Sequence, residues 1–129
     1  MSASGPLQTA IFVKLNAVAG LTGKVFDEVP QGTAYPFAVI GQDTITEMGT
    51  DDSTGTNALV QVHTWSEYAG FKEINDMQAL IFGALDRQVL AVSGWHFVSC
   101  DFVQDIKLRD PDGKTRHVVS EYRVLIDTL

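Results

Sequence analysis

The sequence predicts an α+β fold, in which a mostly antiparallel sheet is packed by two helices in the order α-β-β-α-β-β. Three observations lead to this prediction. Two segments, one at the start of the chain and one in its middle, carry apolar residues at helical spacing. Longer stretches before and after the second helical segment alternate in the manner of strands. The last two strands are joined by a tight-turn sequence, and strands grouped in such pairs between helices are typical of α+β proteins.

The first helix is expected over residues 6–19. Pro6 suits the first helical position, where its missing N–H costs no hydrogen bond, and Gly20 is a natural residue to end the helix. A second apolar set, Phe12 and Val13, lies beside the main apolar stripe and makes this helix apolar on more than one face. We therefore expect it to be covered on two sides, by the sheet and by something else.

The first pair of strands follows a short extended piece at residues 25–27. Residues 37–48 are the first long strand, within which Gly41 marks a bulge or a bend. Residues 49–55 are polar and predict a flexible loop, and residues 56–65 alternate as the next strand. Its expected faces are Ala58, Val60, Val62 and Thr64 on one side and Leu59, Gln61, His63 and Trp65 on the other.

The second helix is expected over residues 71–87, where Gly83 weakens it by about 1 kcal/mol and permits close packing against the sheet. Residues 89–92 read as a short apolar strand or arm. The apolar stripe of the helix is Phe71, Ile74, Gln78, Ile81 and Leu85, with Met77 and Phe82 beside it.

The second pair of strands covers residues 95–108 and about 115–127. The residues Asp110-Pro111-Asp112-Gly113 have the signature of a type I turn and close a hairpin between them. We expect Asp101 and Asp105 on one face of the first of these strands. Its other face is expected to carry Val98, Cys100, Phe102, Gln104, Ile106 and Leu108.

Length and composition favour one domain over residues 1–129, with residues 1–5 expected to be disordered. The net charge is −7, and the nine Lys and Arg residues read as scattered, so a DNA-binding face is not expected. No apolar run reaches the 18 residues of a membrane span, and the N-terminus does not resemble a secretory signal. Cys100, the single cysteine, is expected to be a buried, inert thiol.

The residues that could carry chemistry predict no catalytic, cofactor-binding or metal site. The three histidines, His63, His96 and His117, are widely spaced, and we expect His63 and His117 to be half-exposed on strands. The paired carboxylates at 51–52 and 110/112 lie in polar turns, where solvation and turn geometry explain them. Nucleophile elbows and phosphate-binding glycine loops are absent from the sequence, so an enzyme is not expected.

With its elements placed, the chain resembles the tail completion (tail terminator) proteins of long-tailed phages and gene transfer agents over residues 5–127. No single matching piece is specific, because each also has an explanation as turn or core, and their order and spacing together carry the resemblance. The pieces are PLQTAIFVKLNA from Pro6, LTGKVFD from Leu21, VPQG from Val29, YPFAVIG from Tyr35, VHTWS from Val62, and LRDPDG from Leu108, followed by Arg116 and His117.

This resemblance implies a structural role and a fold similar to that of the lambda tail terminator. Proteins of this family assemble as a ring, usually a homohexamer, on the head-proximal end of the tail tube. The ring stops tube polymerisation and offers a joining surface to the head-side connector or stopper protein. DNA would pass through it without specific binding, and neither a cofactor nor a membrane is implied. The expected location is the tail of a virion or phage-like particle, assembled in the host cytoplasm.

Two loops are the candidate contact elements of such a ring, because loops on a rigid scaffold commonly carry function. The candidate contacts with other subunits, tube or connector are Thr50, Asp51, Asp52, Ser53, Thr54, Arg109, Asp110, Asp112, Lys114 and Arg116. A stretch with acids and no base is the candidate for an acidic lumen, and a merely solvated acidic loop is the alternative. That stretch contributes Asp43, Glu47, Asp51 and Asp52.

Two other interpretations remain open at this point. One is a different neck component, such as a head-completion or connector protein, several of which also form small rings. The other is a small-molecule-binding α+β domain with a pocket between sheet and helices, lined by Trp65, Trp95 and Tyr122. A set of aromatic residues is more often core or interface than a ligand pocket.

Overall fold

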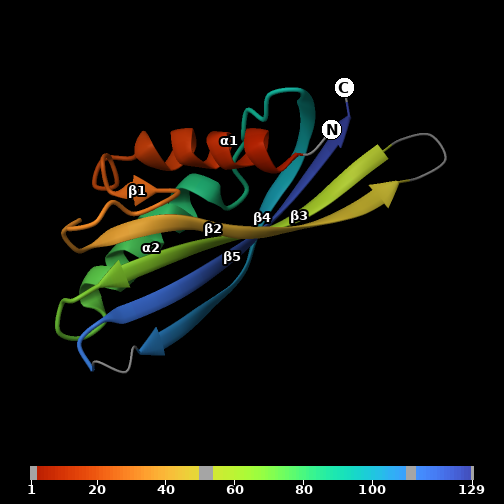
Figure 1. Cartoon of the computed structure of the whole chain (residues 1–129). Helices are drawn as coiled ribbons and strands as arrows, with labels where there is room; N and C mark the ends of the chain where they lie inside the picture. Colours follow the sequence, from red (N-terminus) through yellow and green to blue (C-terminus); the bar gives the residue numbers. More distant parts are fainter. Residues whose placement is uncertain (1–2, 50–53, 110–112, 129) are drawn as a thin grey trace.

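The computed structural model describes residues 3–49, 54–109 and 113–128, which form two helices and five strands (Figure 1). The helices are α1 (Ser4–Asn16) and α2 (Lys72–Leu85), and the strands are β1 (Val25–Phe26), β2 (Phe37–Gly49), β3 (Thr54–Ser66), β4 (Trp95–Arg109) and β5 (Arg116–Thr128). Within these described ranges, neither helix has the length and apolar character needed to cross a bilayer.

The five strands form one sheet in the order β1-β2-β3-β5-β4. The three long pairings are antiparallel, which confirms the predicted α+β class with a mostly antiparallel sheet. The expected order of elements was incomplete, because the short extended piece is a strand that pairs parallel to β2. Strand β3 lies at the centre and pairs with β5 from Gly55 opposite Asp127 to Ser66 opposite Arg116.

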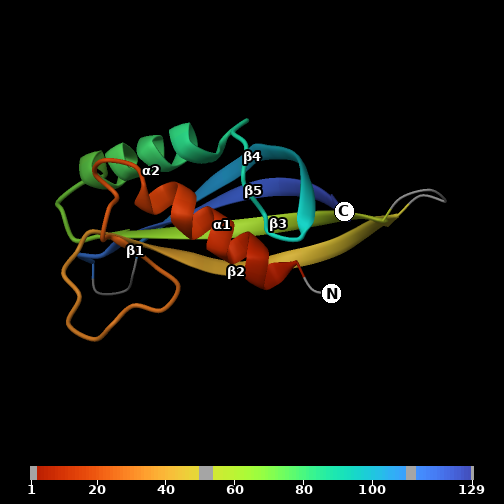
Figure 2. The same ribbon diagram turned by 90° about the horizontal axis from the view of Figure 1, so that it is seen from above.

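Both helices cover the same face of the sheet (Figure 2). Helix α1 lies over β1 and β2, and α2 lies over β3, β5 and β4. The core between helices and sheet takes Leu7, Ile11 and Leu15 from α1, Ile81 and Leu85 from α2, and Ala58, Val60, Val62, Tyr122, Val124 and Ile126 from the strands.

The alternation predicted for β3 is confirmed. Val60 and Val62 are buried under the helices, whereas Gln61 and His63 point to the opposite face and are only half-buried. A regular strand has a side-chain period of two, so a sequence pattern is sufficient to assign its faces.

The single face predicted for β4 is wrong, because two register shifts interrupt the strand. They lie between Phe97 and Ser99 and between Phe102 and Gln104. Each bulge inserts an extra residue and reverses the alternation beyond it. Cys100 therefore faces the core with Phe102, whereas Gln104 and the later alternate residues face the other side of the sheet. Burial raises the pKa of the Cys100 thiol to about 12, as expected for an inert thiol.

Helix α1 begins and ends earlier than predicted. It includes Ser4 and Gly5, which were expected to be disordered, and it ends at Asn16 rather than near Gly20. The Asn16 side chain explains this end, because its Oδ1 accepts a hydrogen bond from the backbone N–H of Gly23 at 2.9 Å. The Asn16 carbonyl also accepts one from the Thr22 hydroxyl at 2.8 Å. These bonds fold the chain back where the helix would otherwise continue.

The structure also refines the prediction for the second helix and the segments around it. Phe71 precedes α2, and Phe82 lies exposed on its outer side. A Cβ at Gly83 would have no neighbour within 4 Å, so Gly83 does not serve close packing. Residues 89–92 form an arm rather than a strand, and the arm buries Leu90 and Val92. The loop predicted at 49–55 is shorter than expected, because β2 extends to Gly49 and β3 begins at Thr54.

Candidate interaction face

The face of the sheet that the helices do not cover, hereafter the open face, is rich in apolar and aromatic side chains. An antiparallel sheet can leave one face to water, and such a face is normally polar. Cross-strand registers place the following residues on it: Phe37 and Val39 from β2; Leu59, Gln61, His63 and Trp65 from β3; His117, Val119, Glu121, Arg123 and Leu125 from β5; Gln104, Ile106 and Leu108 from β4. The same registers also place polar residues on this face toward the Gly55–Asp127 end: Thr44, Thr46, Asn57, Asp101 and Asp127. The exposed apolar side chains at the other end, Ile106 and Leu108, are typical of a surface that another molecule covers.

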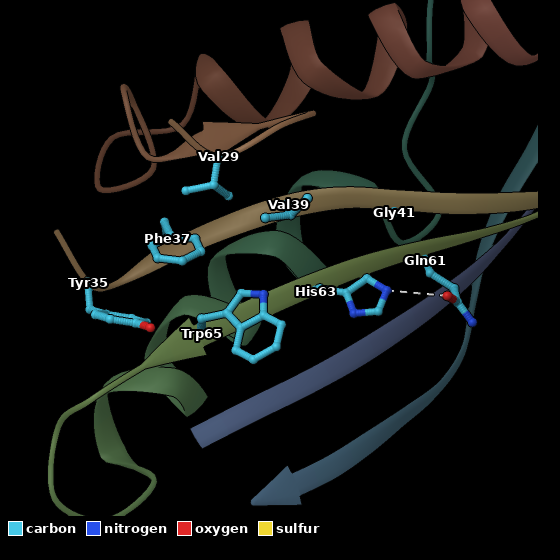
Figure 3. A pocket seen from close by; sticks show the side chains of 8 residues that line it. All are labelled: Val29, Tyr35, Phe37, Val39, Gly41, Gln61, His63 and Trp65. Carbon is cyan, nitrogen blue, oxygen red and sulfur yellow. Dashed lines mark hydrogen bonds between the residues drawn. The ribbon is translucent and has the colours of Figure 1, made fainter. Parts of the chain in front are cut away.

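A hollow of about 570 Å³ lies at the β2–β3 corner of the open face (Figure 3). The loop that follows β1 forms its rim with Val29 and Tyr35. Tyr35 stacks on Phe37 with ring centroids 5.0 Å apart, so the rim and the floor support each other. The lining residues are Val29, Tyr35, Phe37, Val39, Gly41, Gln61, His63 and Trp65.

A stack of rings crosses from β3 to β5 at the edge of this hollow. Trp65 lies on His117 with centroids 3.7 Å apart and planes at 9°, and His63 stacks on the same imidazole at 5.0 Å. His117 is thereby reduced to 9% exposure, so the prediction of a half-exposed His117 is wrong. His63 is half-buried as predicted, and His96 is exposed.

Polar side chains connect the stack to the far side of the open face through a continuous set of hydrogen bonds. His63 Nδ1 and His117 Nε2 are 2.8 Å apart, and His63 Nε2 lies 3.3 Å from Gln61 Oε1. Gln61 Nε2 in turn donates to Glu121 Oε2 at 3.5 Å, and Gln104 Nε2 donates to the other oxygen of that carboxylate. The set ties β3, β5 and β4 together.

The proton positions in this network follow from its acceptors. Gln61 Oε1 can only accept, so His63 Nε2 carries a hydrogen. In a neutral His63 the Nδ1 atom then accepts the bond from His117 Nε2–H. Burial lowers the pKa of His63 below its usual value, which favours this neutral form. The structure therefore favours the neutral form of His63 at neutral pH.

Gly41 leaves the space that the His63 ring occupies. A Cβ at Gly41 would lie 2.5 Å from Cδ2 of His63, closer than side-chain carbons approach one another. The register between β2 and β3 shifts at this point, between Ile40 and Asp43, which confirms the predicted bulge at Gly41. The bulge and the missing side chain together let the imidazole lie over the β2 backbone.

The candidate contact residues fall into two groups that lie at opposite ends of the sheet. The segment 50–54 joins β2 to β3 at the Gly55–Asp127 end, whereas the segment 109–116 joins β4 to β5 at the Ser66–Arg116 end. Thr54 begins β3 and Arg109 ends β4. Thr50, Asp51, Asp52, Ser53, Asp110 and Asp112 lie outside the described residues.

The β4–β5 end is more basic than the sequence interpretation stated. Four of the nine basic residues fall between positions 107 and 116, so they are not scattered. Lys107 Nζ lies 5.5 Å from the centre of the Phe71 ring, and the Arg116 guanidinium lies 5.6 Å from it. Arg116 Nη1 also donates to the Lys114 carbonyl at 2.9 Å, and Lys114 itself is exposed.

The candidate lumen residues that the structure describes share the helix side of β2. Asp43 pairs with Val60 and lies half-buried in a small recess beside the first turn of α1. Glu47 pairs with Thr56 farther along the hairpin and is exposed. Asp51 and Asp52, named above, lie in the segment that is not described.

The pocket expected between sheet and helices from Trp65, Trp95 and Tyr122 is not formed. Trp65 lies on the open face, whereas Tyr122 is fully buried on the helix side, with Trp95 packed against the same core. The hollow could not be predicted from the sequence, because the loop after β1 supplies part of its rim through Val29 and Tyr35. The available signal was the presence of large aromatic residues on the face of β3 opposite the core positions.

Comparison with known proteins places the chain in a family. The family model described as tail completion protein gp17 matches residues 9–127. The chain belongs to the tail completion protein gp17 family. A curated relative, the tail completion protein gp17 of Bacillus phage SPP1, is 28% identical over 128 residues, which cover 97% of this chain and 95% of the relative. As a member of this family, the protein is a structural component of a virion tail and not an enzyme.

A solved structure shares the whole fold. It is a chain in the virion of the native gene transfer agent particle, with a TM-score of 0.91 and 22% sequence identity, and the alignment covers 98% of both chains. At this identity the match shows the fold.

Proposed function

We propose that this tail completion protein forms a ring, a homohexamer by family resemblance, that caps the head-proximal end of the tail tube. The ring stops polymerisation of the tube protein and gives the head-side connector its joining surface. The observation that carries the proposal is the open face, because no helix covers it and it leaves Ile106, Leu108 and the rim residue Tyr35 exposed. Another subunit that covers this face would remove them from water, which is the main driving force of association.

The positions of the two loops support contacts on both sides of such a ring. Strand pairing separates the segments 50–54 and 109–116 by the length of β3, which is roughly 40 Å at about 3.4 Å per residue. If the strands cross the thickness of the ring, one loop faces the tube and the other faces the connector.

The acidic residues fit a passage for DNA. In the proposed ring, Asp43, Glu47, Asp51 and Asp52 face the lumen, where like charge keeps DNA from binding as it passes. Reversing the charge of Glu47, Asp51 and Asp52 is expected to leave assembly intact and to slow DNA delivery. Variant particles that deliver DNA at the wild-type rate would exclude the lumen assignment.

The decisive experiment is removal of the protein from particle assembly, followed by electron microscopy of the tails. We expect tails of variable, excessive length and heads that remain unjoined, with both defects reversed by the wild-type chain. Replacement of residues 50–54 by a short Gly/Ser link is expected to impair length control or head joining. Tails of normal length that join heads without the protein would refute the proposal. A protein that is found elsewhere in the neck would favour the alternative of another neck component.

A second candidate function rests on the hollow itself. Its volume of about 570 Å³ lies within the range of small-molecule sites, roughly 300–1,000 Å³, and its lining is mostly apolar with a few polar groups. A ligand retained through purification and identified by native mass spectrometry would support this function. A protein that purifies without a ligand and whose hollow is covered in the assembled particle would exclude it.

A further inference from the structure

We propose that neighbouring copies in the ring meet through two different surfaces: the outer face of α1 on one copy and the hollow of the open face on the next. This inference rests on the proposed assembly of the chain with itself. The contact joins two unlike surfaces, so it does not end at a symmetric pair.

Helix α1 carries apolar side chains on the side that faces away from the core. Its inner side packs Leu7, Ile11 and Leu15 into the core, yet Phe12 and Val13 point outward, and Val13 is 60% exposed. A helix that is apolar on both sides is typical of one that is buried on both sides. The sequence predicted a second covering element for this helix, and the described residues of the chain do not supply it.

The two surfaces are compatible because neither carries a charged side chain. The outward residues of α1 are Gly5, Thr9, Phe12, Val13 and Asn16, and the hollow is lined by uncharged residues while His63 is neutral. The chain carries a net charge of −7, so most surfaces of two copies repel each other. Asp27 borders Phe12 from the start of the rim loop and can stay at the wet edge of the contact. The hollow therefore accepts the apolar side of α1 without burying an unpaired charge.

The size of the open face suits a stable contact. Its long strands span roughly 40 Å, and the four of them that form the face span roughly 15–20 Å at about 4.8 Å between strands. The resulting area of roughly 600–800 Å² approaches the roughly 800 Å² that each partner buries in a standard interface. The hollow occupies one corner of this area, and the side chains along β5 and β4 can take the remainder of the contact.

Helix α1 lies on one side of the sheet (Figure 2). The hollow is lined by strand residues that face the other side, such as Val39 and His63. A contact between unlike surfaces leaves one of each free after every addition, so copies continue to add, and the assembly ends as a ring when the rotation between copies closes. Two copies joined through identical surfaces would instead stop at a dimer. The placement of the two surfaces thus favours head-to-tail addition, and the proposed hexamer requires a closing rotation between neighbours.

Covalent cross-linking inside assembled particles tests this contact. A double variant, Val13→Cys with Val29→Cys, puts one thiol on each proposed surface, and the native Cys100 is buried. Mild oxidation of variant particles is expected to give a ladder of covalent oligomers of this chain that ends at the size of the ring. The matched control is Val89→Cys with Val29→Cys, because Val89 is 72% exposed and lies outside both surfaces. It is expected to give no ladder.

Mixing two charged variants provides a second test that does not depend on particles. Val13→Glu damages only the α1 surface, and Val29→Glu damages only the hollow. Each variant alone is expected to associate at least 10-fold more weakly than wild type. An equimolar mixture is expected to form one-to-one pairs and no larger species, observed by analytical ultracentrifugation and by NMR shifts of the Trp65 indole in a labelled Val13→Glu chain.

The outcomes separate this inference from the proposed function. Particles with normal tails but no ladder would overturn the contact and leave the terminator role intact. A cross-link from the Val29→Cys chain to the tube protein would assign the hollow to that partner instead. Normal, head-joined tails in the absence of the protein would remove the terminator role whatever the cross-links show.

Discussion

The two faces of the sheet differ in what covers them, because the helices of the chain pack on only one face. Strand β3 shows the difference within a single strand. Val62 is fully buried against the helices of its own chain, whereas its neighbour His63 lies half-buried on the open face. The helix side is a closed apolar core. The open face instead fixes its side chains through ring stacking and a hydrogen-bonded network, and it leaves Ile106 and Leu108 exposed. One face therefore stabilises the fold, and the other is the surface that we propose binds a partner.

The largest expected effect is loss of packing on the helix side. Ile81→Ala removes a side chain with 0% exposure and leaves a cavity between α2 and the sheet. We expect a loss of about 2–5 kcal/mol in the free energy of unfolding, measured by urea denaturation. Val39→Ala, a truncation on the open face, is the matched control and should cost less than half as much. Equal losses would contradict the division between the two faces.

Removal of the Trp65 ring from the open face should have a smaller effect on the stability of the fold. Trp65→Ala deletes the partner that covers His117, so it removes buried aromatic area and one stacking contact. We expect a loss of about 1–3 kcal/mol in stability, together with loss of self-association. Trp65→Phe should retain most of the stability. A Trp65→Ala chain that still associates like wild type would show that this part of the face is not an interface.

The fit between Gly41 and His63 can be tested with a double-mutant cycle. Gly41→Ala places a Cβ against the imidazole, and the ring must move out of its hydrogen bonds. We expect a cost of about 1 kcal/mol. In a His63→Ala background the same change should cost almost nothing, because the clashing ring is gone. An equal cost in both backgrounds would place the role of Gly41 in the backbone bulge alone.

The smallest predicted effect is a pH dependence that arises on the open face. The folded state lowers the pKa of His63 below the usual 6.5, so the unfolded chain binds more protons just below that pH. Stability from His63 is therefore present above pH 6.5 and is lost as pH falls, by less than about 1.4 kcal/mol per pH unit. The groups that face this ring are His117, Gln61 with Glu121 behind it, and Tyr35 across the hollow.

The measurement for this effect is urea denaturation between pH 7.5 and about 5. A His63→Gln variant should reduce the slope over this range, because the ionising group is removed while a polar side chain remains. The Val13→Glu and Val29→Glu mixture should also weaken at the lower pH, since a charged imidazole would lie against the apolar helix. An unchanged slope in His63→Gln would assign the dependence to other groups.

The sequence was sufficient to predict features that follow from a local pattern. It was insufficient where the position of a side chain depends on tertiary contacts. The faces of β3 followed from alternation, and Gly41 marked the bulge in β2. The bulges in β4 left no comparable signal, because Val98 and Val103 are ordinary strand residues, so its faces were assigned wrongly. The burial of His117 depends on the ring of Trp65, its direct register partner on another strand. Such a contact is visible only after the strands are paired.

The two bulges of β4 have one more consequence. Strand β4 is an edge strand of the sheet. A flat edge strand of this length presents a row of unpaired N–H and C=O groups with which strands of other molecules can pair. Bulges at Phe97–Ser99 and Phe102–Gln104 break that row into short pieces and twist it. Free copies of the chain are therefore less able to join edge to edge into a continuous sheet through this strand.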